Sequence, residues 1–157
     1  MGGRVLKYGG PLLAVKDITV SKKFYENVLQ QKVVLDLGVH VSFECGFSLQ
    51  ENYADLIGIN PSNILRKSNN FQLYFEVNDL ESWNNRLKNI DGLEYLHDIK
   101  EYEWGQSVIR IYDPDMHIIE VAESMESVVK RFLNQGLSVE ETAKLTMFPV
   151  EFVKQCL

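Results

Sequence analysis

The chain has 157 residues and a formal net charge of −6 at pH 7, with a sequence pI near 5.1. This acidity argues against nucleic acid or an anionic membrane surface as the main partner. No apolar run approaches the ~20 residues that a membrane-spanning helix needs. The opening stretch MGGRVLKYGG lacks the apolar core of a signal peptide. Two cysteines, Cys45 and Cys156, suit a reducing compartment, and we expect a cytoplasmic protein.

The first half of the chain reads as one strand, one helix and three further strands. Val20, Phe24 and Val28 recur every four residues, which predicts an amphipathic helix over 19–29. Apolar and β-branched runs predict strands over 11–15, 32–37, 39–44 and 47–50. We expect a linker over 51–70, with one short helix near 63–66.

The same order starts again after residue 70. The alternating FQLYFEV run predicts a strand over 71–77, followed by a helix over 80–90 and a strand over 93–99. The stretch from Trp104 to Glu123 reads as two strands around the turn Asp113-Pro114-Asp115-Met116.

A short motif marks this repeat. Val15-Lys16-Asp17-Ile18 precedes the first helix, and Val77-Asn78-Asp79-Leu80 precedes the second at the corresponding place. One helix covers only one face of a small sheet, so the other face must curl or pair. We therefore predict an α+β domain over 1–123, in which two βαβββ modules (about 10–50 and 71–123) form a cupped mixed sheet.

Residues 124–157 predict a separate tail of three short helices. Gly136 ends the first helix, Ser138 and Glu141 form a capping box for the second, and Pro149 begins the third. The spacing is that of a helix-turn-helix unit. From Glu123 onward, however, four basic residues face five acidic ones, which argues against DNA binding. We expect the tail to pack on the core or across a dimer.

Two stretches, VKDITVSKKFYENVL and EWGQSVIRIYDPDMHIIEVAE, together resemble the vicinal oxygen chelate superfamily. This group includes glyoxalase I, extradiol dioxygenases, methylmalonyl-CoA epimerase and bleomycin-resistance proteins. The resemblance covers about residues 10–123 and implies the glyoxalase/bleomycin resistance-like fold and a homodimer. It is specific for the fold and much less so for the reaction, because function depends on the site.

In metal-using members of this superfamily, four side chains hold a divalent cation in the cup. Carried over by the motifs, these positions fall on Gly10, Gln50, Gln72 and Glu120. Only Glu120 is a familiar ligand type, because glycine has no side chain and glutamine amides are weak neutral donors. The resemblance therefore implies a site that has lost its usual metal, and we expect no metal cofactor.

Strand alternation indicates which other side chains enter the cup. If Gln72 and Glu120 point inward, so do Tyr74, Glu76, Arg110 and Tyr112, whereas His117 points away. Arg110 either contacts a ligand or forms an ion pair with Glu120, and a collapsed, filled cup is also open. The candidate ligand-binding set is Gln50, Gln72, Tyr74, Glu76, His97, Trp104, Arg110 and Tyr112.

Three functions remain open from the sequence. The first is a metal-free protein that binds a small organic molecule, similar to the bleomycin-resistance branch. The second is a divergent lyase or isomerase in which Glu120 serves as catalytic base or metal ligand, with His97 helping to recruit a metal. The third is an interaction protein whose tail docks a partner.

Overall fold

The computed structural model describes residues 5–157, so the first four residues, part of the stretch behind the localisation expectation, lie outside the described residues. The chain forms two compact units. The first comprises residues 5–68 with Asp113–Met116, and the second comprises Asn69–Tyr112 with His117–Leu157. Across residues 5–157, no helix has both the length and the apolar character needed to cross a membrane.

The first unit is built on a four-stranded sheet of order β1-β4-β3-β2, in which β1 is parallel to β4. Asp17 caps its long helix by accepting from the backbone N–H of Thr19 and Val20 at 2.9 and 3.0 Å. Tyr25 of that helix packs against Phe43 and Phe47. The elements are β1 (Leu12–Val15), α1 (Ile18–Asn27), β2 (Val33–Asp36), β3 (His40–Phe43) and β4 (Ser48–Glu51).

The predicted helix near 63–66 is wrong. The linker instead holds α2 (Tyr53–Ile57) and the single 3₁₀ turn η1 (Pro61–Asn63). Asn60 caps this turn by accepting from the backbone N–H of Ser62 at 2.9 Å, and Pro61 suits its first position. The backbone of Ile64 is extended. The helical conformation therefore ends at the point where the sequence predicted a helix to begin.

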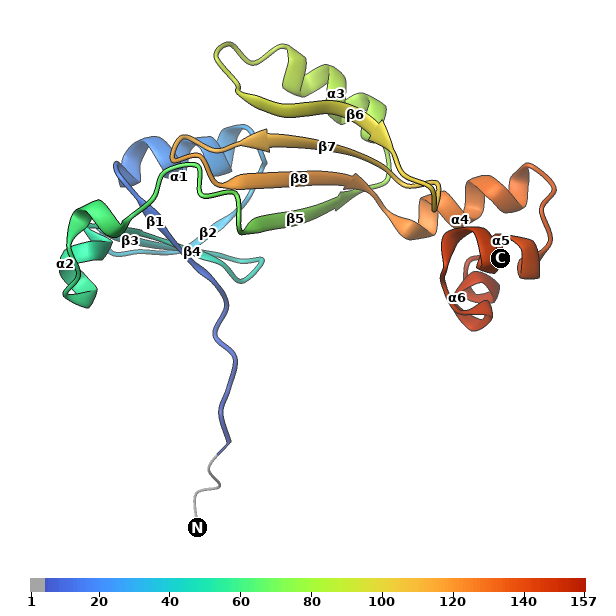
Figure 1. Cartoon of the computed structure of the whole chain (residues 1–157), viewed down its shortest axis with the longest axis horizontal. Helices are drawn as coiled ribbons and strands as arrows, with labels where there is room; N and C mark the ends of the chain where they lie inside the picture. The colour runs from blue at the N-terminus through green and yellow to red at the C-terminus, as the bar shows by residue number, and fades with distance from the viewer. Residues whose placement is uncertain (1–4) are drawn as a thin grey trace. The chain divides into compact units, whose positions relative to one another are not determined.

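The second unit repeats the strand order, as β5-β8-β7-β6 with β5 parallel to β8 (Figure 1). Helix α3 packs against β7 and β8, and Leu87, Ile109 and Ile119 are fully buried. The elements are β5 (Gln72–Val77), α3 (Leu80–Lys88), β6 (Tyr95–Glu101), β7 (Ser107–Tyr112) and β8 (Ile118–Glu123). The prediction of an α+β fold with two βαβββ modules is confirmed.

Three helices follow β8 and belong to the second unit (Figure 1). They are α4 (Met125–Asn134), α5 (Val139–Thr146) and α6 (Val150–Gln155). The predicted capping box is present, because Ser138 and Glu141 each accept from the other's backbone N–H. The helices share a small apolar core of Val129, Ala143, Val153 and Cys156.

Helix α4 packs against the turn between β6 and β7 and is hydrogen-bonded to it. Arg131 donates to the backbone carbonyl of Gly105 at 2.7 Å and pairs with Glu123 at 3.1 Å. Gly105 has a φ of +83°, and a Cβ there would lie 2.4 Å from the ring of Phe132. Only glycine therefore fits under α4 at this point.

Candidate ligand-binding face

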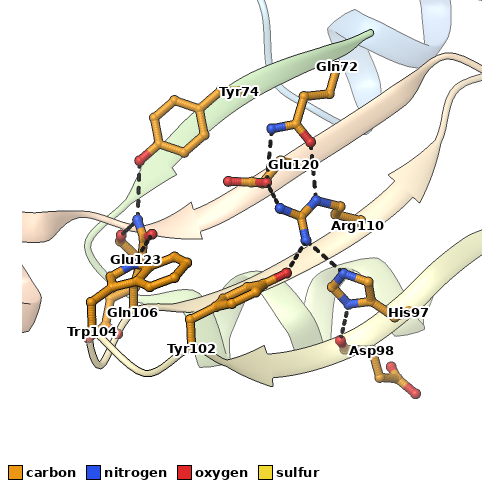
Figure 2. Close-up of polar contacts among 10 residues, drawn as sticks. All are labelled: Gln72, Tyr74, His97, Asp98, Tyr102, Trp104, Gln106, Arg110, Glu120 and Glu123. Atoms are coloured by element: carbon orange, nitrogen blue, oxygen red, sulfur yellow. Dashed lines mark hydrogen bonds and ion pairs between the residues drawn. The ribbon is translucent and has the colours of Figure 1, made fainter. Parts of the chain in front are cut away.

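Three strands of the second sheet bring Gln72, Arg110 and Glu120 together on one face (Figure 2). The guanidinium of Arg110 forms an ion pair with Oε2 of Glu120. Gln72 donates to the same oxygen at 3.0 Å and accepts from Nε of Arg110 at 3.1 Å. Glu120 is only 5% exposed, so its charge is balanced by these contacts rather than by bulk water.

His97 and Tyr102 complete the surroundings of Arg110. Nη1 of Arg110 lies 3.0 Å from Nε2 of His97 and also donates to the hydroxyl of Tyr102. The other ring nitrogen of His97 lies 2.7 Å from the backbone oxygen of Asp98. Because guanidinium only donates and a carbonyl only accepts, these contacts assign His97 as the neutral tautomer with its proton on Nδ1.

An aromatic and amide chain extends the face beyond Arg110. The rings of Tyr102 and Trp104 stack with centroids 4.6 Å apart. Trp104 donates to Gln106 at 3.0 Å, and Gln106 donates to the hydroxyl of Tyr74 at 3.2 Å. Tyr74 in turn donates to Glu76 at 2.7 Å (Figure 2 draws this chain as far as Tyr74). The face therefore presents stacked rings beside a hydrogen-bonded charge pair.

Among Tyr74, Tyr102 and Trp104, Tyr74 is the most exposed ring, at 47%. Partial burial, followed by the nearby carboxylate of Glu76, raises the pKa of Tyr74 to about 12. The phenol therefore stays protonated at physiological pH and keeps its hydroxyl as a donor.

An open hollow of about 300 Å³ adjoins the charge pair at Gln72. It is lined by Asn69, Asn70, Phe71, Gln72 and Ile118. Tyr112, predicted to line the cup, is 3% exposed and donates to Asn69 at 2.9 Å. Tyr112 thus supports the wall of this hollow instead of presenting its ring to solvent.

The first sheet carries a different polar group. Nδ1 of His40 lies 3.0 Å from Oε1 of Gln50, whose amide nitrogen donates to the backbone of Glu51. Nε2 of His40 lies 3.1 Å from Ser42, and Ser42 lies 2.8 Å from Ser48. Gln50 is therefore held by His40 and by the backbone of its own unit.

Gly10 holds one of the four positions that the family resemblance matched to metal ligands. It has a φ of +98°, and a Cβ there would lie 1.9 Å from the backbone oxygen of Gly46. Backbone atoms thus occupy the space that a ligand side chain at this position would need.

The sheet register changes the counterpart of Glu120 in the first half. Val15 pairs with Glu51, and Val77 pairs with Glu123. Glu51 therefore corresponds to Glu123, which makes Ser48, two residues before Gln50, the counterpart of Glu120. A serine hydroxyl is also a poor ligand for a divalent ion.

The donor set does not fit the divalent metal of the superfamily. Glu120 is the one matched carboxylate, and the cation beside it is the guanidinium of Arg110. Within the described part of the chain, no three His, Cys, Asp or Glu residues gather closely enough to hold a metal ion.

Two residues of this face, Tyr102 and Gln106, were missed by sequence reasoning. Tyr102 lies two residues before Trp104, so extending the alternation back from Trp104 could have found it. Gln106 carries no such signal, because it follows the turn at Gly105, where the backbone has a positive φ. The irregular register between β6 and β7 further obscures which side chains share a face.

Known proteins share this architecture. Residues 8–126 match the family model of the glyoxalase-like domain. A protein of unknown function from Agrobacterium tumefaciens str. C58 is 34% identical, with a TM-score of 0.67 over 78% of this chain and 98% of that chain. No protein of curated function matches the chain.

Two further solved structures share the fold at lower identity. The lactoylglutathione lyase from Agrobacterium tumefaciens is 21% identical, with a TM-score of 0.58 over 74% of this chain and 92% of that chain. A glyoxalase/bleomycin resistance protein/dioxygenase from Nocardioides is 17% identical, with a TM-score of 0.60 over 78% and 86%. The tail from residue 127 onward lies outside the family match.

Proposed function

The chain belongs to the glyoxalase-like domain family, and from that premise we propose that it binds a small organic molecule on the face of β5–β8 without a divalent metal. The observation that carries this proposal is the arrangement around Arg110. Stacked rings, amides and a buried charge pair lie on one face next to an open hollow. Small-molecule sites combine apolar and aromatic surface with a few fixed polar groups, and here the rings supply the aromatic surface while Arg110, Gln72 and Glu120 supply the fixed polar groups.

The side chains favour a flat molecule that carries an oxygen acceptor. Tyr74 and the stacked pair of Tyr102 and Trp104 offer ring surfaces, which prefer planar partners. The Arg110 guanidinium offers N–H donors, which prefer carboxylate and carbonyl oxygens. A carboxylate, amide or ketone attached to an aromatic ring would meet both requirements.

Ligand-observed NMR tests this function directly. A library of aromatic acids, amides and amines would be screened for saturation transfer from the protein, beginning with benzoate, benzamide and benzylamine. We expect acids and amides to bind and to lose their signal with Trp104→Ala. The matched control is Trp83→Ala on α3, which should leave binding unchanged. Binding that survives Trp104→Ala, or no binding across the library, would contradict the proposal.

A second candidate, an isomerase or lyase, is favoured by one detail of Glu120. Oε2 accepts hydrogen bonds from both Arg110 and Gln72, whereas Oε1 has no hydrogen-bond partner among residues 5–157. A carboxylate oxygen open to a ligand can remove a proton next to a carbonyl. Exchange of a bound ligand's α-proton in D₂O, lost in Glu120→Gln, would support this reaction. Binding without exchange would leave only the first candidate.

A homodimer is the assembly that we propose. Four side chains of the β2–β3 region are apolar and about half exposed in the single chain: Val34, Leu35, Leu37 and Val39. Exposed apolar side chains that gather on one element often mark an interaction site. Light scattering on the purified protein would give twice the 18.1 kDa chain mass if the proposal holds. A cytoplasmic location is proposed as well, because both cysteines are unpaired thiols.

A further inference from the structure

Arg110 is surrounded like a bound metal ion. Its guanidinium donates to the carboxylate of Glu120, the amide oxygen of Gln72, the imidazole nitrogen of His97 and the hydroxyl of Tyr102. The contact with His97 measures 3.0 Å and the contact with Gln72 measures 3.1 Å. Four acceptors of different strands and loops therefore converge on one positive charge.

Four of the five N–H groups of Arg110 are used by these partners. The fifth, on Nη2, has no hydrogen-bond partner within residues 5–157, and the side chain is 20% exposed. All but one of the donors are thus satisfied, and Tyr74 and Trp104 lie on the same side of the sheet as Arg110 (Figure 2).

We propose that Arg110 is the built-in cation of this site: its guanidinium occupies the point where Gln72, His97 and Glu120 converge, and its free N–H binds an oxygen of the ligand. The inference deepens the proposed function and rests on it for the nature of the ligand. A second cation at this point would lie within a few ångströms of the guanidinium, and the repulsion is poorly screened in a partly buried site.

The ligand class follows from this arrangement. A single N–H on a delocalised cation suits one oxygen that is negative or strongly polarised, such as a carboxylate, a ketone or an enolate. The open oxygen of Glu120 disfavours a second negative group on the same ligand. The expected ligand is therefore an aromatic molecule with one acidic or carbonyl group.

Removing the guanidinium should expose a latent metal site. In the double variant Arg110→Ala, Gln72→His, the new imidazole joins His97 and Glu120, which gives two nitrogens and one carboxylate oxygen. This donor set is one that Zn²⁺ accepts with an open fourth position. Zinc chloride titrated into the double variant is expected to bind one ion per chain, roughly 100-fold tighter than any binding by the unmodified protein.

Two control variants make the result specific. Gln72→His alone carries the same new imidazole but keeps Arg110, and it is expected to gain no zinc site. Adding Glu120→Gln to the double variant is expected to abolish zinc binding. Zinc should also raise the melting temperature of the double variant and leave that of the unmodified protein unchanged, which reports on the site even if the double variant folds poorly.

Three results would overturn the inference. One is a zinc ion held by the unmodified protein and lost in Glu120→Gln. Another is zinc bound by Gln72→His alone as tightly as by the double variant. The third is a double variant, folded by circular dichroism, that gains no zinc. None of these depends on an organic ligand, so failure of the proposed function, read from the NMR screen, is a separate outcome.

Discussion

In the first unit, the side chains of His40, Ser42, Ser48 and Gln50 on β3 and β4 bond to one another, whereas in the second unit β7 and β8 carry a guanidinium–carboxylate pair. His40 lies opposite Gln50 in one sheet, and Arg110 lies opposite Glu120 in the other. The strand order is the same in both. The repeat therefore supplies the framework, and the charge that can act on a ligand is concentrated in the second half.

The two parallel edge strands differ in the same direction. At Gly10, before β1, the backbone of Gly46 fills the space where a side chain would project. At the equivalent Gln72, at the start of β5, an exposed amide reaches both Arg110 and Glu120. One half has closed this position with main chain, and the other uses it to hold the charge pair.

The largest effect is expected from Arg110→Ala. Loss of the guanidinium leaves Glu120 buried and unpaired, and we expect unfolding free energy to fall by about 3–5 kcal/mol. Chemical denaturation would measure this change. The double variant Arg110→Ala, Glu120→Ala should recover part of the loss, and an Arg110→Ala protein as stable as the unmodified one would show that water already solvates Glu120.

Gly10→Ala tests the closed position of the first half. The added Cβ would meet the oxygen of Gly46 at a φ that alanine rarely adopts, so we expect a loss of about 3 kcal/mol. Gly9→Ala is the matched control, because nothing lies within 4 Å of a Cβ there. Equal melting temperatures for the two variants would refute the close approach.

Tyr25→Phe tests the core of the first unit and its dependence on pH. Tyr25 donates to Asp113 at 2.7 Å, and its removal should cost about 1–3 kcal/mol. Burial, and then the charge of Asp113, raises the pKa of Tyr25 well above its usual value.

The sign of the pH effect follows from that raised pKa. The folded state keeps the phenol proton that the unfolded state loses near pH ~10, so this stabilisation is complete below pH ~10 and declines above it. The decline is expected at about 1.4 kcal/mol per pH unit and should be absent in Tyr25→Phe. Denaturation curves between pH 8 and 11 would measure it, and identical slopes in both proteins would contradict the assignment.

The smallest effect is expected from His40→Ala, which removes the imidazole that lies opposite Gln50 in the first sheet. Its hydrogen bonds go to the uncharged side chains of Gln50 and Ser42, so we expect a loss of about 1 kcal/mol. The comparison with Arg110→Ala is read from the same denaturation experiment. A loss as large as that of Arg110→Ala would mean that the two sheet faces do not differ as their charges indicate.

The fold was predictable because the strand and helix patterns of each half, and the matching motifs that begin at Val15 and Val77, can be read from short stretches of sequence. Strand alternation also placed Gln72, Arg110 and Glu120 on one face, and the structure joins them through direct contacts. The linker helix was misplaced because the cap at Asn60 outweighed the local helix pattern.

Other parts of the site depend on information that sequence spacing does not carry. The pairing between β1 and β4 makes Ser48 the counterpart of Glu120 in the first half. The alignment of the two halves by their motifs had instead selected Gln50, two residues further on. Tyr102 and Gln106 enter the site through a turn held by Arg131 and Phe132 of the tail. Such contacts join segments far apart in sequence.

Metal content of the purified protein tests the central claim most directly. The protein would be incubated with nickel, zinc, manganese and iron salts, dialysed, and analysed by mass spectrometry of the elements. With Arg110 as the cation beside Glu120, we predict far less than one retained ion per chain, and the same result for Glu120→Gln. One ion retained per chain, and lost in Glu120→Gln, would contradict the account.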